Sequence, residues 1–452
     1  PPSRIGALPA HQVTTRHLGA AYPLLAEGGL GHRGVLVGHD LLGGSFVHDP
    51  FELYAAGIVS NPNMVVFGQI GRGKSAFIKT YLWRQSVFGR RAWIVDPKGE
   101  YGPLAGAWGV RPVTLRPGGT VRLNPLDPGP DDRRPPGTDP AGASGPTADA
   151  ARTNGRSHPG RDVAGAGDRQ AGLLASLAAA CLGRPVQPRE RAAADLALAS
   201  VCARKGVATL PDVVDALLAP SAESARSIRT DRANLLEDGR DVALELRRLV
   251  HGDLGGMFDG PTSDGLDLSA PLVVLDLSAL YNSPALGILM ACATAWLQAA
   301  LARQASRPAP SAGGSHVLVV VDEAWAVLAN LGVARWLQAS WKLSRAYGVA
   351  NVAILHRLSD LRSAGATGSE QVGLASGLLA DSETRVVYAQ SPGEVAAASE
   401  LLSLSPTEAD LLPQLPRGVA LWKVGRRSFL VRHVIGPNER ALSDTDTAML
   451  SR

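Results

Sequence analysis

A glycine-rich octet at residues 68–75 has the residue types and spacing for chemistry on a phosphate. It reads Gly-Gln-Ile-Gly-Arg-Gly-Lys-Ser, which matches the pattern G-x-x-x-x-G-K-S. Glycines let backbone N–H groups converge on a phosphate, Lys74 would reach the β- and γ-phosphate oxygens, and Ser75 would ligate Mg²⁺. The octet therefore predicts an ATP and Mg²⁺ site. Its nucleotide-binding residues are expected to be Gly68, Gly71, Arg72, Gly73, Lys74, Ser75 and Ala76.

Two adjacent carboxylates, Asp322 and Glu323, follow the apolar run 317–321. A strand that ends in such a pair is what a P-loop ATPase needs opposite its lysine and serine. Asp322 would hold the Mg²⁺ shell. Glu323 would orient or deprotonate the attacking water, because hydrolysis requires a base within hydrogen-bond reach of that water. A small-molecule kinase would need a lid and an acceptor pocket, so the pair favours ATP hydrolysis coupled to mechanical work.

Apolar runs predict the elements that would position these residues. Residues 64–67 are expected to form a buried strand before the octet, and residues 74–88 a helix after it. Further strands are predicted at 92–95, 271–276, 317–321, 351–355 and 384–388, and hairpins at 34–47 and 418–431. The run Asp-Pro-Lys-Gly-Glu-Tyr at 96–101 follows a strand. Its acidic residues should face the crevice where ligands bind in open α/β sheets.

The middle of the chain has a different composition. Residues 127–162 contain no Val, Ile, Leu or aromatic residue, and such a segment cannot bury enough surface to order itself. Helical spacing of apolar residues then fills 173–250. The sequence therefore divides into six parts: a lead-in segment with a hairpin at 1–62, the first part of an α/β core at 63–126, a disordered linker at 127–167, an inserted all-α subdomain at 168–255, the second part of the core with a C-terminal hairpin at 256–440, and a tail at 441–452.

Composition sets wider limits. A chain of 452 residues with 45% hydrophobic content is long enough for two or three domains. Its net charge of +4 comes from arginine, in a chain rich in Ala, Gly and Pro, and carries little weight for a nucleic-acid partner. The three cysteines form no C-x-x-C pair, which argues against a zinc site or a disulfide framework and fits the reducing cytoplasm. The first residue is Pro1 and no signal peptide follows, so we expect a C-terminal piece of a longer protein.

One uncharged stretch, residues 277–302, is long enough to suggest a membrane span. It contains Asn282, Pro284 and Gln298, and it lacks basic flanks on one consistent side. It also follows a strand pattern. We therefore interpret it as a helix buried inside the α/β core.

The order of motifs resembles the HerA/FtsK pumping ATPases. The matching features are the phosphate loop, D-P-K-G-E-Y at 96–101, inserted helices, V-V-V-D-E-A at 319–324, S-R-A-Y-G at 344–348 and T-R-V-V-Y at 384–388. The D-P-K-G-E-Y run, the long insertion and the closing hairpin are most similar to the conjugation and type IV secretion ATPases. This resemblance covers residues 34–440. It implies a RecA-like P-loop core, mainly a parallel sheet with helices on both faces, with an inserted all-α subdomain.

The resemblance also implies site residues beyond the two motifs. In that family the ATP sites lie between neighbouring subunits of a hexamer. Arg345 stands where the family places an arginine finger, which offsets charge on the γ-phosphate of the adjacent subunit. Arg385 is the second candidate, and an ordinary surface arginine is the alternative for Arg345. His356 stands where the family usually has Gln to contact the γ-phosphate and the nucleophilic water, although an ordinary packed histidine is an equal interpretation.

Together these features predict an ATP-hydrolysing hexameric motor that energises type IV secretion or conjugative transfer. Its expected partners are components of the secretion channel and a DNA or protein substrate, and its expected place is the cytoplasmic face of the cell membrane. Two alternatives stay open. One is a DNA translocase or helicase of the same superfamily, which strong, salt-sensitive DNA binding would favour. The other is a nucleotide-gated assembly scaffold with little turnover.

Overall fold

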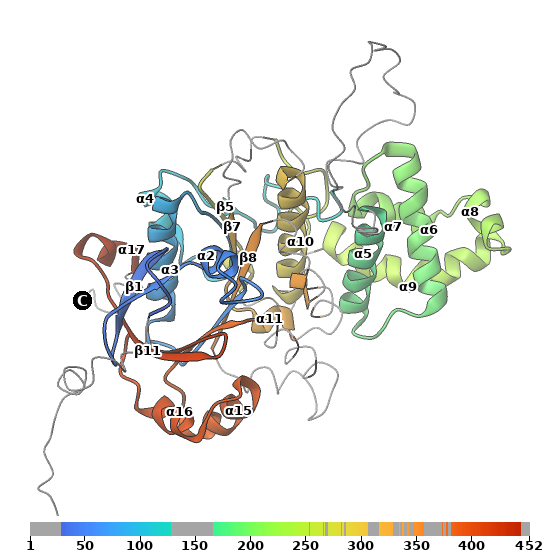
Figure 1. Ribbon diagram of the computed structural model, residues 1–452. Coiled ribbons are helices and arrows are strands. Elements are labelled where there is room, and N and C mark those ends of the chain that lie inside the picture. The colour runs from blue at the N-terminus through green and yellow to red at the C-terminus, as the bar shows by residue number, and fades with distance from the viewer. Residues whose placement is uncertain are drawn as a thin grey trace, which may run out of the picture.

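The computed structural model of the chain has helices on both faces of a single large sheet (Figure 1). It describes residues 29–127, 166–252, 254–264, 266, 270–281, 283, 286–305, 316–328, 334, 337, 338, 341, 342, 348–356, 373, 377 and 381–443. The predicted linker at 127–167 and the predicted tail at 441–452 lie almost entirely outside these residues.

Within the described residues the sheet has 11 strands in the order β2-β1-β11-β10-β9-β3-β8-β7-β4-β6-β5. Their bounds are β1 Val35–Asp40, β2 Ser45–His48, β3 Met64–Phe67, β4 Arg91–Asp96, β5 Val113–Thr114, β6 Leu272–Asp276, β7 Val317–Val321, β8 Val349–Leu355, β9 Thr384–Tyr388, β10 Val419–Val424 and β11 Arg427–His433. Neighbours from β9 to β5 run parallel, whereas β10, β11, β1 and β2 extend the sheet in antiparallel fashion. The strands predicted from apolar runs are all confirmed, and so are both hairpins.

The helices described are α2 Pro50–Ala55, α3 Lys74–Gln85, α4 Gly102–Ala107, α5 Ala166–Leu182, α6 Pro188–Lys205, α7 Leu210–Leu218, α8 Ala222–Ser227, α9 Arg232–His251, α10 Leu286–Ala305, α11 Trp325–Leu328, α15 Pro392–Leu402, α16 Pro406–Leu411 and α17 Arg440–Ser443. Helix α3 is shorter than predicted. A 3-10 turn, η2, occupies Ser86–Phe88, and Gly89 then closes it in the left-handed region. Further 3-10 turns of the same length occur at Ser278–Leu280, Leu412–Gln414 and Pro437–Glu439.

Two hydrophobic cores lie on opposite faces of the sheet. Successive side chains of a strand point to opposite faces. Accordingly, Val65 and Phe67 of β3 pack in one core with α10 and the helices after residue 166, whereas Met64 and Val66 pack in the other with α3. Strands buried on both faces explain why the central runs are continuously apolar rather than alternating.

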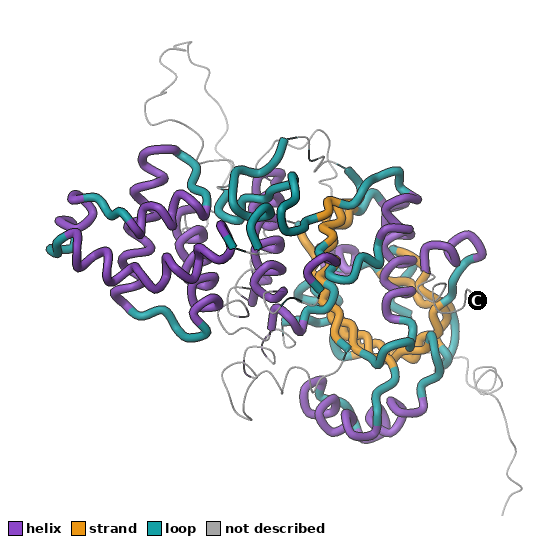
Figure 2. The backbone as a smooth tube through the Cα atoms, turned by 180° about the vertical axis from the view of Figure 1, so that it is seen from behind, coloured by secondary structure: helices purple, strands orange, loops and turns teal. Residues whose placement is uncertain are grey.

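Helices α5 to α9 form a group of their own beside the sheet (Figures 1 and 2). Polar contacts join this helical group to the segment that leaves β5. The side chain of Asn124 donates to the carbonyl of Ala208 over 2.9 Å, and Gln170 donates to the carbonyl of Leu126 over 2.6 Å. The group also shares a hydrophobic core with α10, which lies between it and the sheet (Figure 1).

Helix α10 is the element predicted inside the uncharged stretch 277–302. Its side chains Leu289, Cys292 and Trp296 are fully buried in the core that covers one face of the sheet. None of the described helices is both long enough and apolar enough to cross a membrane. The prediction of a buried core helix is confirmed, with bounds at Leu286 and Ala305 rather than at the ends of the uncharged stretch.

Candidate nucleotide-binding site

The glycine-rich octet forms the turn between β3 and α3. Gly73 is the residue before α3 and has φ 109°, a left-handed conformation that favours glycine, and it offers no side chain to cap the helix. Gly68 has φ 152°, and a Cβ there would lie 2.5 Å from Cβ of Tyr388. The backbone N–H of Gln69 donates to the carbonyl of Ala389 over 3.2 Å, which ties the turn to the end of β9. A helix N-terminus behind such a turn is suited to bind an anion.

Lys74 is the buried cation of the turn, with 3% of its surface exposed. Its Nζ donates to the carbonyl of Gln69 over 2.9 Å and also to the carbonyl of Gly68. Burial lowers the pKa of Lys74 to about 8, although the negative charges of Asp322 and Glu323 act in the opposite direction. The two carboxylates are therefore close enough to act on the Lys74 charge.

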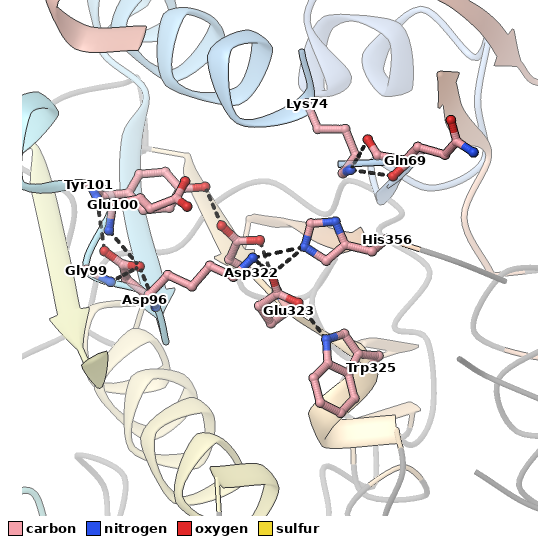
Figure 3. A network of polar contacts seen from close by, with 12 residues as sticks. Gln69, Lys74, Asp96, Gly99, Glu100, Tyr101, Asp322, Glu323, Trp325 and His356 are labelled. Atoms are coloured by element: carbon pink, nitrogen blue, oxygen red, sulfur yellow. Dashed lines mark hydrogen bonds and ion pairs between the residues drawn. The ribbon is translucent and has the colours of Figure 1, made fainter. Parts of the chain in front are cut away.

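The sheet order explains how distant motifs meet. Strand β8 lies between β3 and β7, and all three strands run parallel. Phe67 pairs with Leu355, so His356 follows β8 beside the start of the octet. The carboxyl ends of parallel strands share one edge of the sheet, where ligands bind in this class of fold. The octet, His356 and the acidic pair of β7 therefore lie along one line at that edge (Figure 3).

Asp322 is 4% exposed and has two hydrogen-bond donors. The hydroxyl of Tyr101 donates to Oδ2 over 3.3 Å, and the backbone N–H of Glu323 donates to Oδ1 over 2.9 Å. Burial and the neighbouring Glu323 charge raise the pKa of Asp322 to about 7. A buried carboxylate with little compensation fits a place that a cation would stabilise.

This edge could bind Mg²⁺ through a few protein oxygens together with the nucleotide phosphates, rather than through protein ligands alone. Ser75 is half-buried in the first turn of α3, and its hydroxyl and the Asp322 carboxylate are the hard oxygen donors that Mg²⁺ prefers. Among the described residues no group of three or more acidic, His or Cys side chains could hold a metal ion. Mg²⁺ is usually bound by one or two protein oxygens, with waters and the nucleotide phosphates completing its shell.

Glu323 is held in place by three donors from three segments. Lys98 and His356 Nε2 both contact Oε1, and the indole N–H of Trp325 donates to Oε2. The Glu323 backbone has φ 51°, an unusual left-handed value for a residue other than glycine. Burial alone would raise the pKa of this carboxyl, but the hydrogen bonds from His356 and Lys98 outweigh it and lower the pKa to about 2.

Lys98, Tyr101 and Trp325 are site residues that sequence reasoning did not assign. The signal for the first two was the run 96–101, which the sequence places at a strand end without giving any side chain a role. Asp96 organises this run: its Oδ1 accepts from the backbone N–H groups of Lys98 (3.1 Å), Gly99 (2.8 Å) and Glu100 (3.2 Å). Its Oδ2 accepts from the backbone N–H of Tyr101 over 3.0 Å (Figure 3).

Of the two predicted arginine candidates, the structure places Arg385 alone, and Arg385 lies away from this edge. Arg345 lies outside the described residues. Arg385 pairs with Val65 across β9 and β3, toward the end of the strand opposite the octet. Its guanidinium donates to the carbonyls of Ser382 (3.1 Å) and Leu402 (3.3 Å) of its own chain. The structure therefore brings Lys74, Asp322, Glu323 and His356 together but leaves Arg385 apart from them.

The other predicted members of the octet lie around the turn. The Arg72 guanidinium donates to Oε1 of Gln69 over 3.2 Å, and the Arg72 carbonyl accepts from the backbone N–H of Gly418 over 3.0 Å. Gly71 has φ 76°. Ala76 lies within the first turn of α3. The Arg72 side chain thus stays within the octet, and its backbone carbonyl joins the octet to the segment before β10.

No family model matches the sequence, and no curated protein matches it. Solved structures do. VirB4 of Thermoanaerobacter pseudethanolicus has a TM-score of 0.67 at 20% identity, covering 92% of this chain and 100% of that one. The bacterial conjugative coupling protein TrwBdeltaN70 has a TM-score of 0.52 at 17% identity, covering 90% of each chain. TrwB in complex with ADP and Mg²⁺ has a TM-score of 0.51 at 16% identity, covering 83% of this chain and 85% of that one.

At these identities the likeness shows a shared fold. The predicted fold class is confirmed: a RecA-like P-loop core with a mainly parallel sheet, helices on both faces and an inserted all-α subdomain.

Proposed function

We propose that this chain is an ATP-hydrolysing motor that energises conjugative transfer or type IV secretion. The observation that supports it best is the shared edge of β3, β8 and β7. That edge carries a phosphate-binding turn, a histidine and an acidic pair in consecutive strands. A turn alone would support nucleotide binding only. The acidic pair two strands away adds the groups needed for hydrolysis.

In this proposal each side chain has one task. Lys74 would leave the carbonyls of Gly68 and Gln69 to bind the β- and γ-phosphate oxygens, and Ser75 and Asp322 would hold Mg²⁺. Bound Mg²⁺ would offset charge on the phosphates. Glu323 accepts the proton of the attacking water once an oxygen is available. His356, whose ring stands between the turn and Glu323, reports the presence of the terminal phosphate by a hydrogen bond.

The choice of conjugation or secretion among P-loop motors rests on the fold likeness to VirB4 and TrwB and on the inserted helical group. We extend it to a hexamer with ATP sites between subunits, in which Arg345 is the first candidate for the arginine finger. Arg385 is less favoured, because its guanidinium already donates to two carbonyls of its own chain. Channel components, and DNA or a secreted protein at the cytoplasmic face of the membrane, are the partners this proposal requires.

A nucleotide-gated scaffold is the second candidate, and one observation favours it. Both carboxylate oxygens of Glu323 already accept hydrogen bonds, so a water molecule must compete for the base. A scaffold would bind ATP and turn over rarely. A motor would release phosphate continuously.

Steady-state phosphate release by the purified chain, over a range of protein concentrations, distinguishes the two candidates. The variant Glu323→Gln should lower kcat by about a hundredfold to a thousandfold, the range for loss of a general base, while ADP binding stays unchanged. Glu408→Gln is the matched control, because Glu408 pairs with Lys423 far from the octet on the antiparallel side of the sheet. Equal turnover in Glu323→Gln and wild type would exclude Glu323 as the base.

A further inference from the structure

The run 96–101 is a rigid turn that the assigned roles leave unused. The Asp96 carboxylate accepts four backbone N–H groups, and Gly99 has φ 72°. The Asp96 carbonyl also accepts from the backbone N–H of Leu277 over 2.8 Å, which ties the turn to the end of β6. This turn is fixed on both sides. It therefore presents its side chains at defined positions.

Lys98 is the side chain that this turn directs at the acidic pair. Its Nζ contacts Oε1 of Glu323, lies 3.1 Å from Nε2 of His356 and lies 5.7 Å from the centroid of the Tyr281 ring. Glu323 is 1% exposed, whereas 22% of the Lys98 side chain is exposed. The Lys98 ammonium thus lies between the buried Glu323 carboxylate and the solvent.

The contact of Lys98 with Glu323 would hinder Glu323 from acting as a general base. A base must accept a proton from a water molecule within about 2.6–3.2 Å of its oxygen. Lys98 is an ammonium that only donates, and Trp325 already occupies the other oxygen of Glu323. Charge-assisted hydrogen bonds are stronger than neutral ones, so Lys98 is the donor hardest for a water molecule to replace.

We propose that Lys98 is a positioning residue that holds Glu323 in a resting position and thereby restrains hydrolysis until a phosphate draws the ammonium away. Lys98 and Lys74 are close enough for their charges to repel. A triphosphate held by Lys74 would therefore offer Lys98 a second anion near its present position. The inference rests on the proposed ATPase function and adds a release step to it.

The test is the ATPase rate of the full chain with Lys98→Met, which removes the ammonium and keeps much of the apolar stem. We expect kcat to rise about tenfold, the equivalent of losing about one charge-assisted hydrogen bond, with KM for ATP unchanged. A misfolded variant cannot produce a faster enzyme, so the sign of the change separates positioning from general damage. Lys98→Arg should keep the ion pair and restore the wild-type rate.

Lys423→Met is the matched control, since Lys423 donates to Oε2 of Glu408 over 3.0 Å on β10, remote from the site. Lys98→Gln, which keeps a neutral donor, should show a smaller rise and serves if Lys98→Met does not fold. Wild-type turnover with an equal or lower kcat in both Lys98→Met and Lys98→Gln overturns this inference alone. Turnover that appears in Lys98→Met and Lys98→Gln but not in wild type or Lys98→Arg supports it. No turnover in any variant overturns both this inference and the proposed function.

Discussion

Two turns at the same edge of the sheet differ in how their backbone groups are satisfied. The octet leaves β3 and the run 96–101 leaves β4, and each contains a glycine in the left-handed region. In the second turn Asp96 accepts the four N–H groups, so the protein completes its own anion site. In the octet no acidic side chain occupies the first turn of α3, and a lysine is buried against the carbonyls instead. The run 96–101 thus satisfies its own N–H groups, whereas the helix N-terminus behind the octet is suited to bind an anionic ligand.

The difference predicts opposite effects on stability and function. Lys74→Met should weaken ADP binding by about a hundredfold or more, because the β-phosphate loses its cation. The same variant should stabilise the free protein by about 1–2 kcal/mol, since the buried ammonium costs about 3 kcal/mol by its pKa and two hydrogen bonds to carbonyls offset part of that cost. Calorimetric ADP titration and urea unfolding measure the two effects. A Lys74→Met chain that is less stable than wild type would remove the contrast between the turns.

Asp96→Asn tests the run 96–101, in which the Asp96 carboxylate accepts the backbone N–H groups. An amide cannot accept hydrogen bonds at both ends, so the backbone N–H of Tyr101 or those facing Oδ1 lose their acceptor. We expect a loss of about 2–3 kcal/mol in the free energy of unfolding, with a much smaller change in ADP affinity than in Lys74→Met. Asp231→Asn is the matched control. Asp231 caps α9 with one N–H bond of 2.8 Å, and Asn caps helices about as well as Asp.

The third and smallest effect is a pH dependence of stability that comes from Lys74 in the octet. The pKa of Lys74 is about 8 in the folded chain and 10.5 in its ordinary state. Between these values the unfolded chain binds the extra proton, so the cost of the buried charge is present below pH 8 and disappears as pH rises toward 10.5. The stability gap between Lys74→Met and wild type should therefore shrink by about 1–2 kcal/mol from pH 8 to pH 9.5. Urea unfolding of both chains at each pH measures it, and a constant gap would contradict the buried-charge explanation.

Sequence patterns predicted those parts of the site that depend on local spacing. The octet and the acidic pair each occupy a short run, and the strands before them are continuously apolar because both faces are covered. The contact of Lys98 with Glu323 was not predictable in this way. It depends on β4 pairing with β7, and one sequence carries no signal for the order of parallel strands.

Backbone geometry and strand register explain the other features of the structure that the sequence patterns did not predict. Strand β5 is only two residues long, too short for any periodicity, and the left-handed backbone of Glu323 has no marker in its residue type. Arg385 was a candidate through resemblance alone. The pairing of β9 with β3 places it away from the octet, which the letters T-R-V-V-Y do not reveal. The catalytic roles given to Lys74, Ser75, Asp322, Glu323 and His356 stay predictions until the variants above are measured.

The position of β8 between β3 and β7 fixes the distance between the phosphate turn and the acidic pair. Neighbouring strands lie about 4.8 Å apart, so the phosphate turn and the acidic pair are about 10 Å apart whatever side chains surround them. That gap is set by backbone hydrogen bonds alone. Most surface and core residues can therefore change while the gap is kept. A slip of β8 by one residue, by contrast, would turn His356 to the opposite face of the sheet. No side chain of β8 would then stand between the phosphate turn and the acidic pair.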